Sequence, residues 1–493
     1  MTTISTVAVH GLTGHPLTLT AAAVDGPPGI TLVTGHQSAN RELHDRVHAA
    51  LANSRPRHGD PRPHVEVRIP PASAQPEAAA VAVAVLAATL DVVPQRLAST
   101  AVLGEVGLDG SLRPTLGVLP AAQAAYAHGI RRVIVPAASL GQAALVDGLD
   151  VLGAHTLAEI ADWLRGDDAA LHRLSVPAGP VAARQPAPMS ALTATAQRVV
   201  TIAAAGGHHL LCGFGTDAGT AAVASWLHAL VPDLTPQQQL ELAAIQSLLG
   251  PREDGAALVS TPPLVVTHHS DPIASLLGGP QPGLLSQAHH GVLFAPELDE
   301  FGAAAQEALR GVLIEREVRL SHDGRTHRFP SGLQLIATSI RTSAPRRWQM
   351  APALRDAIDI QTIARHTALH PKPDAHDHAR VTRLLKRARA DVATARARAA
   401  ARWSRAGQGP GVTNASVPHA VLHAVAGTAA VADRVRHAQD TGALSGRGAD
   451  IALRLAWTVA DLDGADEPGR HHIEQALALR NAVDIGPTEA EVR

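Results

Sequence analysis

Lysine is almost absent from this 493-residue chain. Only two of its 42 basic residues are lysines, Lys372 and Lys386, so none occurs in the first 371 positions. The absence matters because a nucleotide-binding loop of the usual kind needs a lysine that reaches the β- and γ-phosphates. A peptidase that activates serine with lysine is excluded from the same region, because its general base has no source there.

Cysteine, aromatic residues and long apolar runs are scarce as well. Cys212 is the only cysteine, which excludes an internal disulfide and a cysteine-built zinc site and is typical of a reducing cytoplasm. Aromatic residues make up 2%, so Ala, Val and Leu must fill the cores. The longest apolar run, residues 78–90, is shorter than the roughly 20 residues that cross a bilayer and predicts a buried helix.

The N-terminal sequence and the charge balance narrow the cellular setting. Residues 1–11 contain no basic stretch followed by an apolar run, so we expect no signal peptide, a cytoplasmic protein and no membrane partner. The net charge of −2 creates no overall field for nucleic acid. Any affinity for DNA must therefore come from a local patch.

The chain is long enough for two to four domains. Residues 1–165 alternate β-rich runs with helical patterns and predict an α/β domain. Spaced prolines in 166–188 predict a linker, and strand–helix alternation in 189–365 predicts a mainly parallel sheet. The almost wholly helical pattern of 366–493 predicts an α-helical unit. In the second unit the expected elements are helices 194–205, 218–230 and 302–315, and strands 210–213, 291–294 and 333–338.

Three stretches, residues 103–122, 202–211 and 286–301, together resemble the ComM/YifB family of magnesium-chelatase-like AAA+ proteins. The resemblance covers nearly the whole chain. It implies a Lon-protease-like (ribosomal S5 domain 2-like) N-terminal domain, a P-loop NTPase-like AAA+ core with a parallel sheet, and an α-helical lid. It also implies ATP and Mg²⁺ as the family's cofactors, and rings as its assemblies.

By this resemblance residues 213–221 correspond to the phosphate-binding loop. The degenerate loop retains Gly213, Gly215, Asp217, Gly219 and Thr220. Thr220 stands where the family has its lysine, Ala221 stands where it has its magnesium-binding hydroxyl, and Asp217 adds a charge that repels triphosphate. If the alignment to the family is shifted by one residue, Thr220 supplies the magnesium-binding hydroxyl, but the loop still has no lysine. The favoured interpretation is a relic turn, and the alternative is weak nucleotide binding by the backbone and the helix N-terminus.

The remaining catalytic positions are also altered. Pro296 replaces the acid that would hold magnesium, and Glu297 remains at the position that orients the attacking water. Ile340 falls near the sensor position, where Ser339 is the only nearby polar substitute. The loop 341–347 contains no cysteine, so the cysteine-rich knuckle usual in the family is lost.

The groups expected to act between subunits are incomplete too. Ala357 occupies the place of the arginine finger, with Arg355 as a poorly aligned replacement. Trp457 occupies one arginine position of the lid, where Arg447 and Arg454 remain as candidate sensor residues.

We expect no intact catalytic site, no bound cofactor, and a non-hydrolysing subunit for binding or scaffolding. Its partners would be copies of itself or an active paralogue in a mixed ring. The rival hypothesis is an active, ATP-dependent hexameric motor that translocates on DNA or migrates its branches.

A basic helix provides the local patch. It contains nine basic residues and one acid, Asp391; the basic residues are Arg380, Arg383, Lys386, Arg387, Arg389, Arg396, Arg398, Arg402 and Arg405. Of these, Arg383, Lys386, Arg387, Arg398 and Arg402 are the candidate DNA contacts. Either they hold phosphates with salt-dependent affinity, or the helix is merely solvated or packed on acidic neighbours.

The 28 histidines suggest metal binding in one place only. That place is the spacing of His366, His370, His376, Asp377 and His378. We interpret these as solvated polar residues around a proline-containing turn. The pairs at 208–209, 268–269 and 289–290 are assigned no metal.

Overall fold

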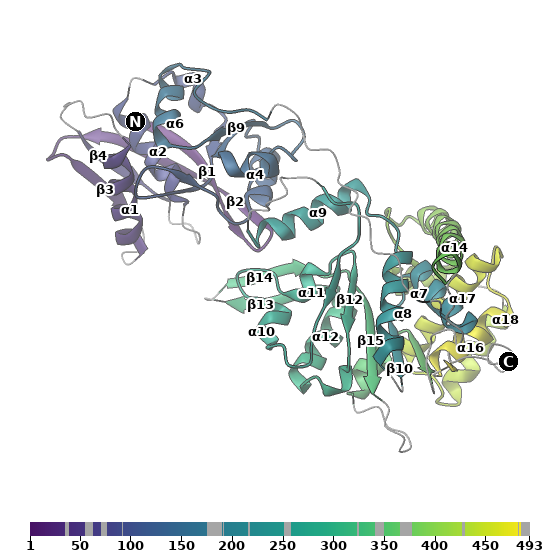
Figure 1. Ribbon diagram of the computed structural model, residues 1–493. Coiled ribbons are helices and arrows are strands. Elements are labelled where there is room, and N and C mark those ends of the chain that lie inside the picture. The colour runs from purple at the N-terminus through teal and green to yellow at the C-terminus, as the bar shows by residue number, and fades with distance from the viewer. Residues whose placement is uncertain are drawn as a thin grey trace.

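The computed structural model describes residues 1–34, 39–54, 63–70, 76–90, 92–174, 190, 192–214, 217–250, 258–322, 325–340, 350–364, 377–425, 429–481 and 483–484. The first unit (purple to blue in Figure 1) lies at one end, and a second sheet (teal to green) follows. The C-terminal helices (yellow) pack beside that second sheet. The fold is mixed α/β with a helical C-terminal part, as predicted.

The first sheet has the strand order β3-β4-β2-β1-β5-β8-β9. The strands are β1 Thr2–His10, β2 Thr13–Val24, β3 Gly29–Val33, β4 His64–Arg68, β5 Thr100–Val102, β8 Arg132–Pro136 and β9 Asp150–Ala154. Strands β1 and β2 form an antiparallel hairpin, whereas β1, β5, β8 and β9 run parallel. The hairpin turns within two residues because Gly11 adopts a φ of 58°.

Helices cover both faces of this sheet. Helices α1 (Ala39–Asn53), α2 (Ala78–Thr89) and α6 (Leu157–Arg165) share one core, and α4 (Val118–Ala127) with α5 (Leu140–Ala143) builds the other. The prediction of a buried helix at 78–90 is confirmed, because α2 buries all its positions from Ala78 to Ala87. The smaller elements are α3 Pro94–Leu97, β6 Glu105–Val106, β7 Leu112–Arg113 and the 3-10 turn η1 Ala137–Ser139.

The start of the predicted linker belongs structurally to the first unit. Leu171 is buried in the core of that unit. His172 and Gly153 exchange both backbone hydrogen bonds, each of 2.8 Å. The remainder of the linker, residues 175–188, lies outside the described residues.

The second sheet is entirely parallel, in the order β11-β12-β15-β10-β16-β17. Its strands are β10 Leu210–Phe214, β11 Leu264–Val266, β12 Val292–Ala295, β15 Gln334–Ile340, β16 Ile360–Ala364 and β17 Val483–Asp484. The helices of this unit are α7 Ala194–Gly206, α8 Asp217–Leu230, α9 Pro236–Ser247, α10 Ile273–Leu277, α11 Leu284–Gln287, α12 Ala303–Glu315 and α13 Pro352–Ala357. All six predicted elements are confirmed to within two residues. The sequence analysis missed α9 and the hairpin of β13 (Glu317–His322) and β14 (Arg325–Pro330).

The C-terminal part contains α14 Asp377–Arg405, η3 Asn414–Ser416, α15 His419–Ala424, α16 Ala429–Asp440, α17 Gly446–Asp463 and α18 Arg470–Arg480. The described part of this region is helical as expected, apart from one short strand that the sequence analysis missed. Strand β17 pairs with β16 through Thr362 and Val483, and a two-residue strand is too short to show an alternating pattern. The helices share one continuous core with α7 and α8, so they are not a separately packed body.

The first unit and the core are joined through the start of α4. Helix α4 begins after Gly117, which has a φ of 77° and no side chain to cap the helix. Ser247, at the end of α9, supplies the missing acceptors. Its carbonyl accepts from Gly117 N (2.8 Å) and its hydroxyl accepts from Leu119 N (3.2 Å). Among the described helices, none combines the length and the apolarity needed to cross a membrane.

A buried carboxylate lies at the start of α2. Glu77 accepts a hydrogen bond from Gly104 N, and Gly104 O accepts in turn from Ala79 N. Gly104 has a φ of 132°, and a β-carbon there would lie 2.7 Å from Pro136 Cγ, so only glycine fits this close approach. Burial raises the pKa of Glu77 to about 7, although the Gly104 N–H partly offsets the effect.

We expect Glu77→Gln to flatten the pH dependence of stability. The contribution of Glu77 to stability should fall as pH rises from about 4.5 towards 7, because its raised pKa makes the ionised form costly in the folded state. At pH 8 the variant should be more stable by on the order of 2 kcal/mol, and at pH 4 it should match the parent. Thermal midpoints at both pH values test this, with exposed Glu42→Gln as the control. A pH-independent difference would contradict it.

Candidate functional site

The neighbouring parallel strands β12, β15 and β10 end together at the carboxyl edge of the second sheet. Strand β10 ends at Phe214 and α8 begins at Asp217, so two residues separate strand and helix. Register places Gly213 beside Ser339 of β15. A tight strand-to-helix connection at this edge is where parallel α/β sheets bind phosphate.

Only part of the predicted phosphate loop can be placed. Gly215 and Thr216 lie outside the described residues, and so does the side chain of Asp217. In the first turns of α8, Gly219 is buried and Thr220 is half-buried. The structure therefore retains the helix start that the loop would use, while the lysine is missing from the sequence.

The acids of this edge are occupied by local partners. Glu297 has a left-handed backbone (φ 54°), donates its N–H to Thr338 Oγ1 at 3.0 Å, and has a carboxylate oxygen 3.5 Å from His269 Nδ1. Ser339, the candidate sensor, donates its hydroxyl to Asp299 Oδ2 at 2.7 Å. The second oxygen, Asp299 Oδ1, is buried and accepts from none of the described residues.

The sequence analysis did not consider Asp299. This residue lies in the 3-10 turn η2 (Leu298–Glu300), and the turn brings its carboxylate under the end of β15. Its contact with Ser339 depends on pairing between β12 and β15, which are separated by 40 residues at this point. Local patterns do not contain that information.

The candidate lid arginines lie at the opposite edge. Arg447 and Arg454 line a cavity of about 500 Å³ together with Ala357, His209 and Asp359. His209 and Asp359 directly precede β10 and β16, so the cavity lies at the amino ends of these strands. The five residues of β10 span about 13 Å. The structure thus brings Arg447, Arg454 and the finger position Ala357 together, and separates them from Glu297 and Ser339.

Arg355, the poorly aligned replacement for the finger, is exposed on α13. The neighbouring Asp356 is held by Arg480, whose guanidinium donates to it at 2.9 Å. The finger position itself, Ala357, is buried. A substitution there would therefore have to point an arginine into the cavity.

Asp359 is the electrostatic centre of the amino edge. Its Oδ2 accepts from His209 N at 2.9 Å and lies 3.3 Å from His208 Nδ1. Burial opposes its ionisation, but the hydrogen bond and charge of His208, with smaller contributions from His209, lower the pKa of Asp359 to about 2. Burial also lowers the pKa of His209 to about 4, so that ring is neutral near pH 7. His208 Nε2 continues the network to Thr458 Oγ1 at 2.8 Å.

Arg402 is not on the exposed face where the DNA hypothesis needs it. Its guanidinium pairs with the buried carboxylate of Asp461 and lies 3.9 Å from the ring centroid of Trp457. Asn414 donates to Asp461 Oδ2 at 2.9 Å and accepts from Trp403 Nε1 at 2.8 Å. These residues form a clamp between α14, η3 and α17, which we call the lid clamp.

The other candidate DNA contacts are exposed. Arg383, Lys386, Arg387, Arg398 and also Arg405 are solvent-exposed, and none of them forms an ion pair with a described residue. Arg389 and Arg396 point the other way. Arg389 donates to Ala229 O at 2.8 Å and Arg396 to Ala204 O at 2.6 Å, at the C-terminal ends of α8 and α7. Their charge there is favourable with the helix dipole.

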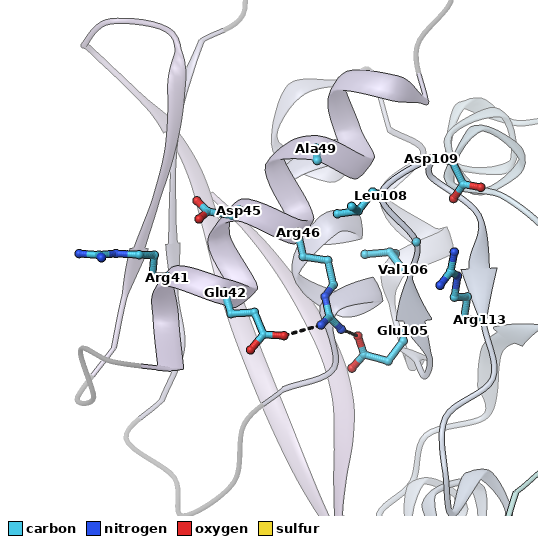
Figure 2. Close-up of a pocket in the computed structure, with 11 residues that line it drawn as sticks. Arg41, Glu42, Asp45, Arg46, Ala49, Glu105, Val106, Leu108, Asp109 and Arg113 are labelled. Atoms are coloured by element: carbon cyan, nitrogen blue, oxygen red, sulfur yellow. Dashed lines mark hydrogen bonds and ion pairs between the residues drawn. The ribbon is translucent and has the colours of Figure 1, made fainter.

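The first unit contains a larger open cavity, of about 1120 Å³, between α1 and the β6–β7 turn (Figure 2). Arg46 lies at its centre and bonds Glu42 at 2.6 Å and Glu105 at 3.0 Å. The residues that line it include no serine, lysine, cysteine or histidine. This cavity therefore offers no serine, cysteine or lysine for peptide hydrolysis.

Comparison with known proteins identifies relatives along nearly the whole chain. A family model described as "Magnesium chelatase, subunit ChlI" matches residues 191–352, its C-terminal counterpart matches 385–480, and "Subunit ChlI of Mg-chelatase" matches 20–139. An uncharacterized protein of Mycobacterium tuberculosis is 34% identical over 96% of this chain and 97% of its own. The protein YifB of Escherichia coli is 31% identical over 68% of this chain and 67% of its own. The competence protein ComM of Haemophilus influenzae is 30% identical over 67% and 66%.

The chain belongs to the ComM/YifB family of magnesium-chelatase-like proteins. The comparisons thus confirm the resemblance drawn from residues 103–122, 202–211 and 286–301. The Lon-protease-like character of this ComM/YifB member's first unit stays a prediction.

We expect Arg402→Met to destabilise this ComM/YifB protein by about 3 kcal/mol, because it leaves the buried Asp461 carboxylate without its cation. Arg398→Met, on the exposed side of the same helix, should change stability by no more than about 0.5 kcal/mol. Urea denaturation followed by tryptophan fluorescence measures both. Equal effects of the two substitutions would mean that the lid clamp contributes nothing specific.

Proposed function

We propose that this chain is a ComM/YifB subunit that does not hydrolyse ATP and serves as a binding or scaffolding member of a ring in DNA processing. The observation that carries the proposal is the distribution of charge along the second sheet. At the carboxyl edge, the described residues include the carboxylates of Glu297 and Asp299. The arginines Arg447 and Arg454 lie at the amino edge.

A triphosphate at the carboxyl edge would therefore meet negative charge and would need a positive charge to offset it. Lysine cannot supply it, because none occurs before Lys372. Each altered group, from the loop lysine to the finger arginine, is worth orders of magnitude in the rate of phosphoryl transfer. Their combined absence supports loss of turnover more strongly than any single substitution.

The amino-edge cavity supports a role towards a neighbouring subunit. Arg447 makes no hydrogen bond or ion pair with any described residue, and it shares the cavity with the finger position Ala357. These residues are too far from the chain's own phosphate loop to serve it. In a mixed ring they can face the nucleotide of an active paralogue, so this chain would assist hydrolysis without performing it.

The alternative is an active hexameric DNA motor. It is favoured by the retention of Glu297, Arg447 and Arg454, which are the residues such a motor would use. It requires nucleotide to be held without lysine and magnesium to be held without an acid at Pro296. The two hypotheses differ in ATP turnover by the isolated protein.

We expect millimolar affinity for ATP or none, and no hydrolysis above background with or without single-stranded or branched DNA. Calorimetry and a coupled phosphate assay measure these. The double substitution Thr220→Lys with Ala221→Thr should tighten binding without restoring turnover, since Pro296 and Ala357 still lack their charged groups. Micromolar binding together with DNA-stimulated turnover by the parent would establish the motor instead.

The basic face of α14 supports the DNA part of the proposal. Arg383, Arg387, Arg398 and Arg405 are separated by 4, 11 and 7 residues, each close to a whole number of helical turns. The exposed cations therefore form one stripe, which we call the α14 stripe. A ring would repeat the stripe in each subunit and multiply weak phosphate contacts.

The triple variant Arg383→Ala, Arg387→Ala and Arg398→Ala should bind DNA more weakly, with a salt slope reduced by about 2 to 3. The control removes three arginines that already have acidic partners: Arg310→Ala, Arg319→Ala and Arg436→Ala. This control lowers the net charge by the same amount as the triple variant. It should nevertheless leave the salt slope nearly unchanged, because its three arginines are already paired with acids. Fluorescence anisotropy against salt measures both. Identical salt slopes in the two variants would show that the α14 stripe is only a solvated face and does not bind DNA.

A further inference from the structure

Three groups of histidines and acids in the described part of the chain place their possible ligand atoms within 4.8 Å of one another. They are Glu241 with His289 and His290, Asp463 with His471 and His472, and Asp450 with His419 and His423. A histidine binds a metal through a nitrogen lone pair, so the ring proton must sit on its other nitrogen. The hydrogen bonds made by each ring therefore decide which group can bind a metal.

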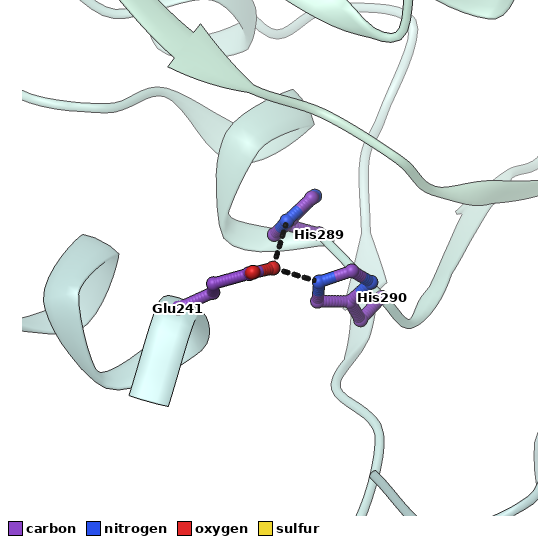
Figure 3. A group of neighbouring side chains, drawn as sticks. All are labelled: Glu241, His289 and His290. Atoms are coloured by element: carbon purple, nitrogen blue, oxygen red, sulfur yellow. Dashed lines mark hydrogen bonds and ion pairs between the residues drawn. The ribbon is translucent and has the colours of Figure 1, made fainter. Parts of the chain in front are cut away.

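The first group is closed to metals. Figure 3 shows the Glu241 carboxylate facing both imidazoles, with distances of 2.6 Å to His290 Nε2 and 3.6 Å to His289 Nε2. His289 Nδ1 accepts a hydrogen bond from Gly332 N at 2.8 Å. The proton of the neutral ring is thereby placed on Nε2, the nitrogen that faces Glu241. His289 offers no lone pair to a cation there.

The second group is closed for the same reason. His472 Nδ1 accepts from Gly469 N at 2.8 Å, so its proton sits on Nε2, which faces Asp463 at 3.7 Å. The Asp463 carboxylate is in addition paired with Arg198 at 2.7 Å. The backbone again dictates a tautomer that excludes a metal.

The third group is open. His419 Nδ1 lies 2.7 Å from Asp450 Oδ2, and His423 Nε2 lies 2.8 Å from Asp450 Oδ1. The far nitrogens, His419 Nε2 and His423 Nδ1, bond to none of the described residues, so each is free to carry the proton. Both lone pairs can then face the carboxylate. The two rings stand four residues apart on α15, which places them on one face.

We propose that His419, His423 and Asp450 form a binding site for a divalent transition metal of the zinc class. Two imidazoles and one carboxylate are a ligand set that Zn²⁺ takes in tetrahedral sites, with the fourth position left to water. Ligands about 2.0 to 2.2 Å from a tetrahedral metal stand roughly 3.3 Å apart, so insertion of the ion moves each ring by on the order of 0.5 Å. The rings have that freedom because their side chains are 69% and 45% exposed, whereas Asp450 is 16% exposed and firmly placed on α17.

Occupancy would have a local consequence. Asp450 lines the amino-edge cavity with Arg447 and Arg454, and its charge partly offsets theirs. A bound cation would neutralise Asp450 and tie α15 to α17. The site does not depend on ATP hydrolysis, so it stands or falls separately from the proposed function.

The test is a Zn²⁺ titration of the full-length, EDTA-treated protein in competition with a chromogenic chelator. We expect one equivalent to bind with micromolar affinity, and His419→Gln or His423→Gln to weaken binding at least tenfold. His290→Gln, in the closed first group, should leave binding unchanged. Because both ligating rings are exposed, the variants should keep the parent's thermal midpoint.

A second measurement tests whether the metal binds at this site rather than at other histidines of the chain. Co²⁺ in the parent should give the intense visible absorption of a four-coordinate ion, and His423→Gln should abolish it. The variant His366→Gln with His370→Gln removes the spaced histidines outside the described residues and should retain the signal. Failure of the parent to bind a stoichiometric ion overturns the proposal. Loss of the signal in the 366/370 variant, with retention in His423→Gln, does so as well.

Discussion

The Asp359 carboxylate is the group on which the arrangement of core and lid depends. It is buried at the junction of β10 and β16 and accepts hydrogen bonds from His209 N and His208. A continuous chain runs from it through His208, Thr458 and Asn414 to Asp461 and Arg402. Buried polar groups are costly when unpaired, so each member holds the next in one geometry. This chain of contacts fixes the helical part to the sheet.

Much of the fold could be predicted from local patterns. Helix α7 and strand β10 have the apolar periodicity of buried elements. Helix α2 is apolar on all sides, so its burial could be predicted without knowing which face meets the core. The parallel sheet followed from alternation of strands and helices. Strand β17 and the β13–β14 hairpin were missed because they owe their formation to pairing partners rather than to a strong pattern of their own.

The candidate site was less predictable, because side-chain contacts across the fold decide it. Arg402 is one basic residue among many on α14, and only the distant Asp461 and Trp457 distinguish it from exposed Arg398. Asp299 reaches Ser339 from a different strand. Sequence assigned Arg447 and Arg454 to a sensor role, but the end of the sheet at which they lie depends on how α17 packs against α7 and α14. A motif therefore identifies residue types, and packing determines which of them meet.

The capping of α4 by Ser247 makes the first unit mechanically part of the core. Helix α4 has no cap of its own at Gly117, and its first N–H groups are satisfied only while α9 lies against it. Separation would expose these donors and the apolar contact of α4 with Ala244 together. The position of the first unit is therefore coupled to that of α9. A shift of α9 would be passed directly to α4, and from α4 to strands β1 and β2 of the first sheet, against which α4 packs.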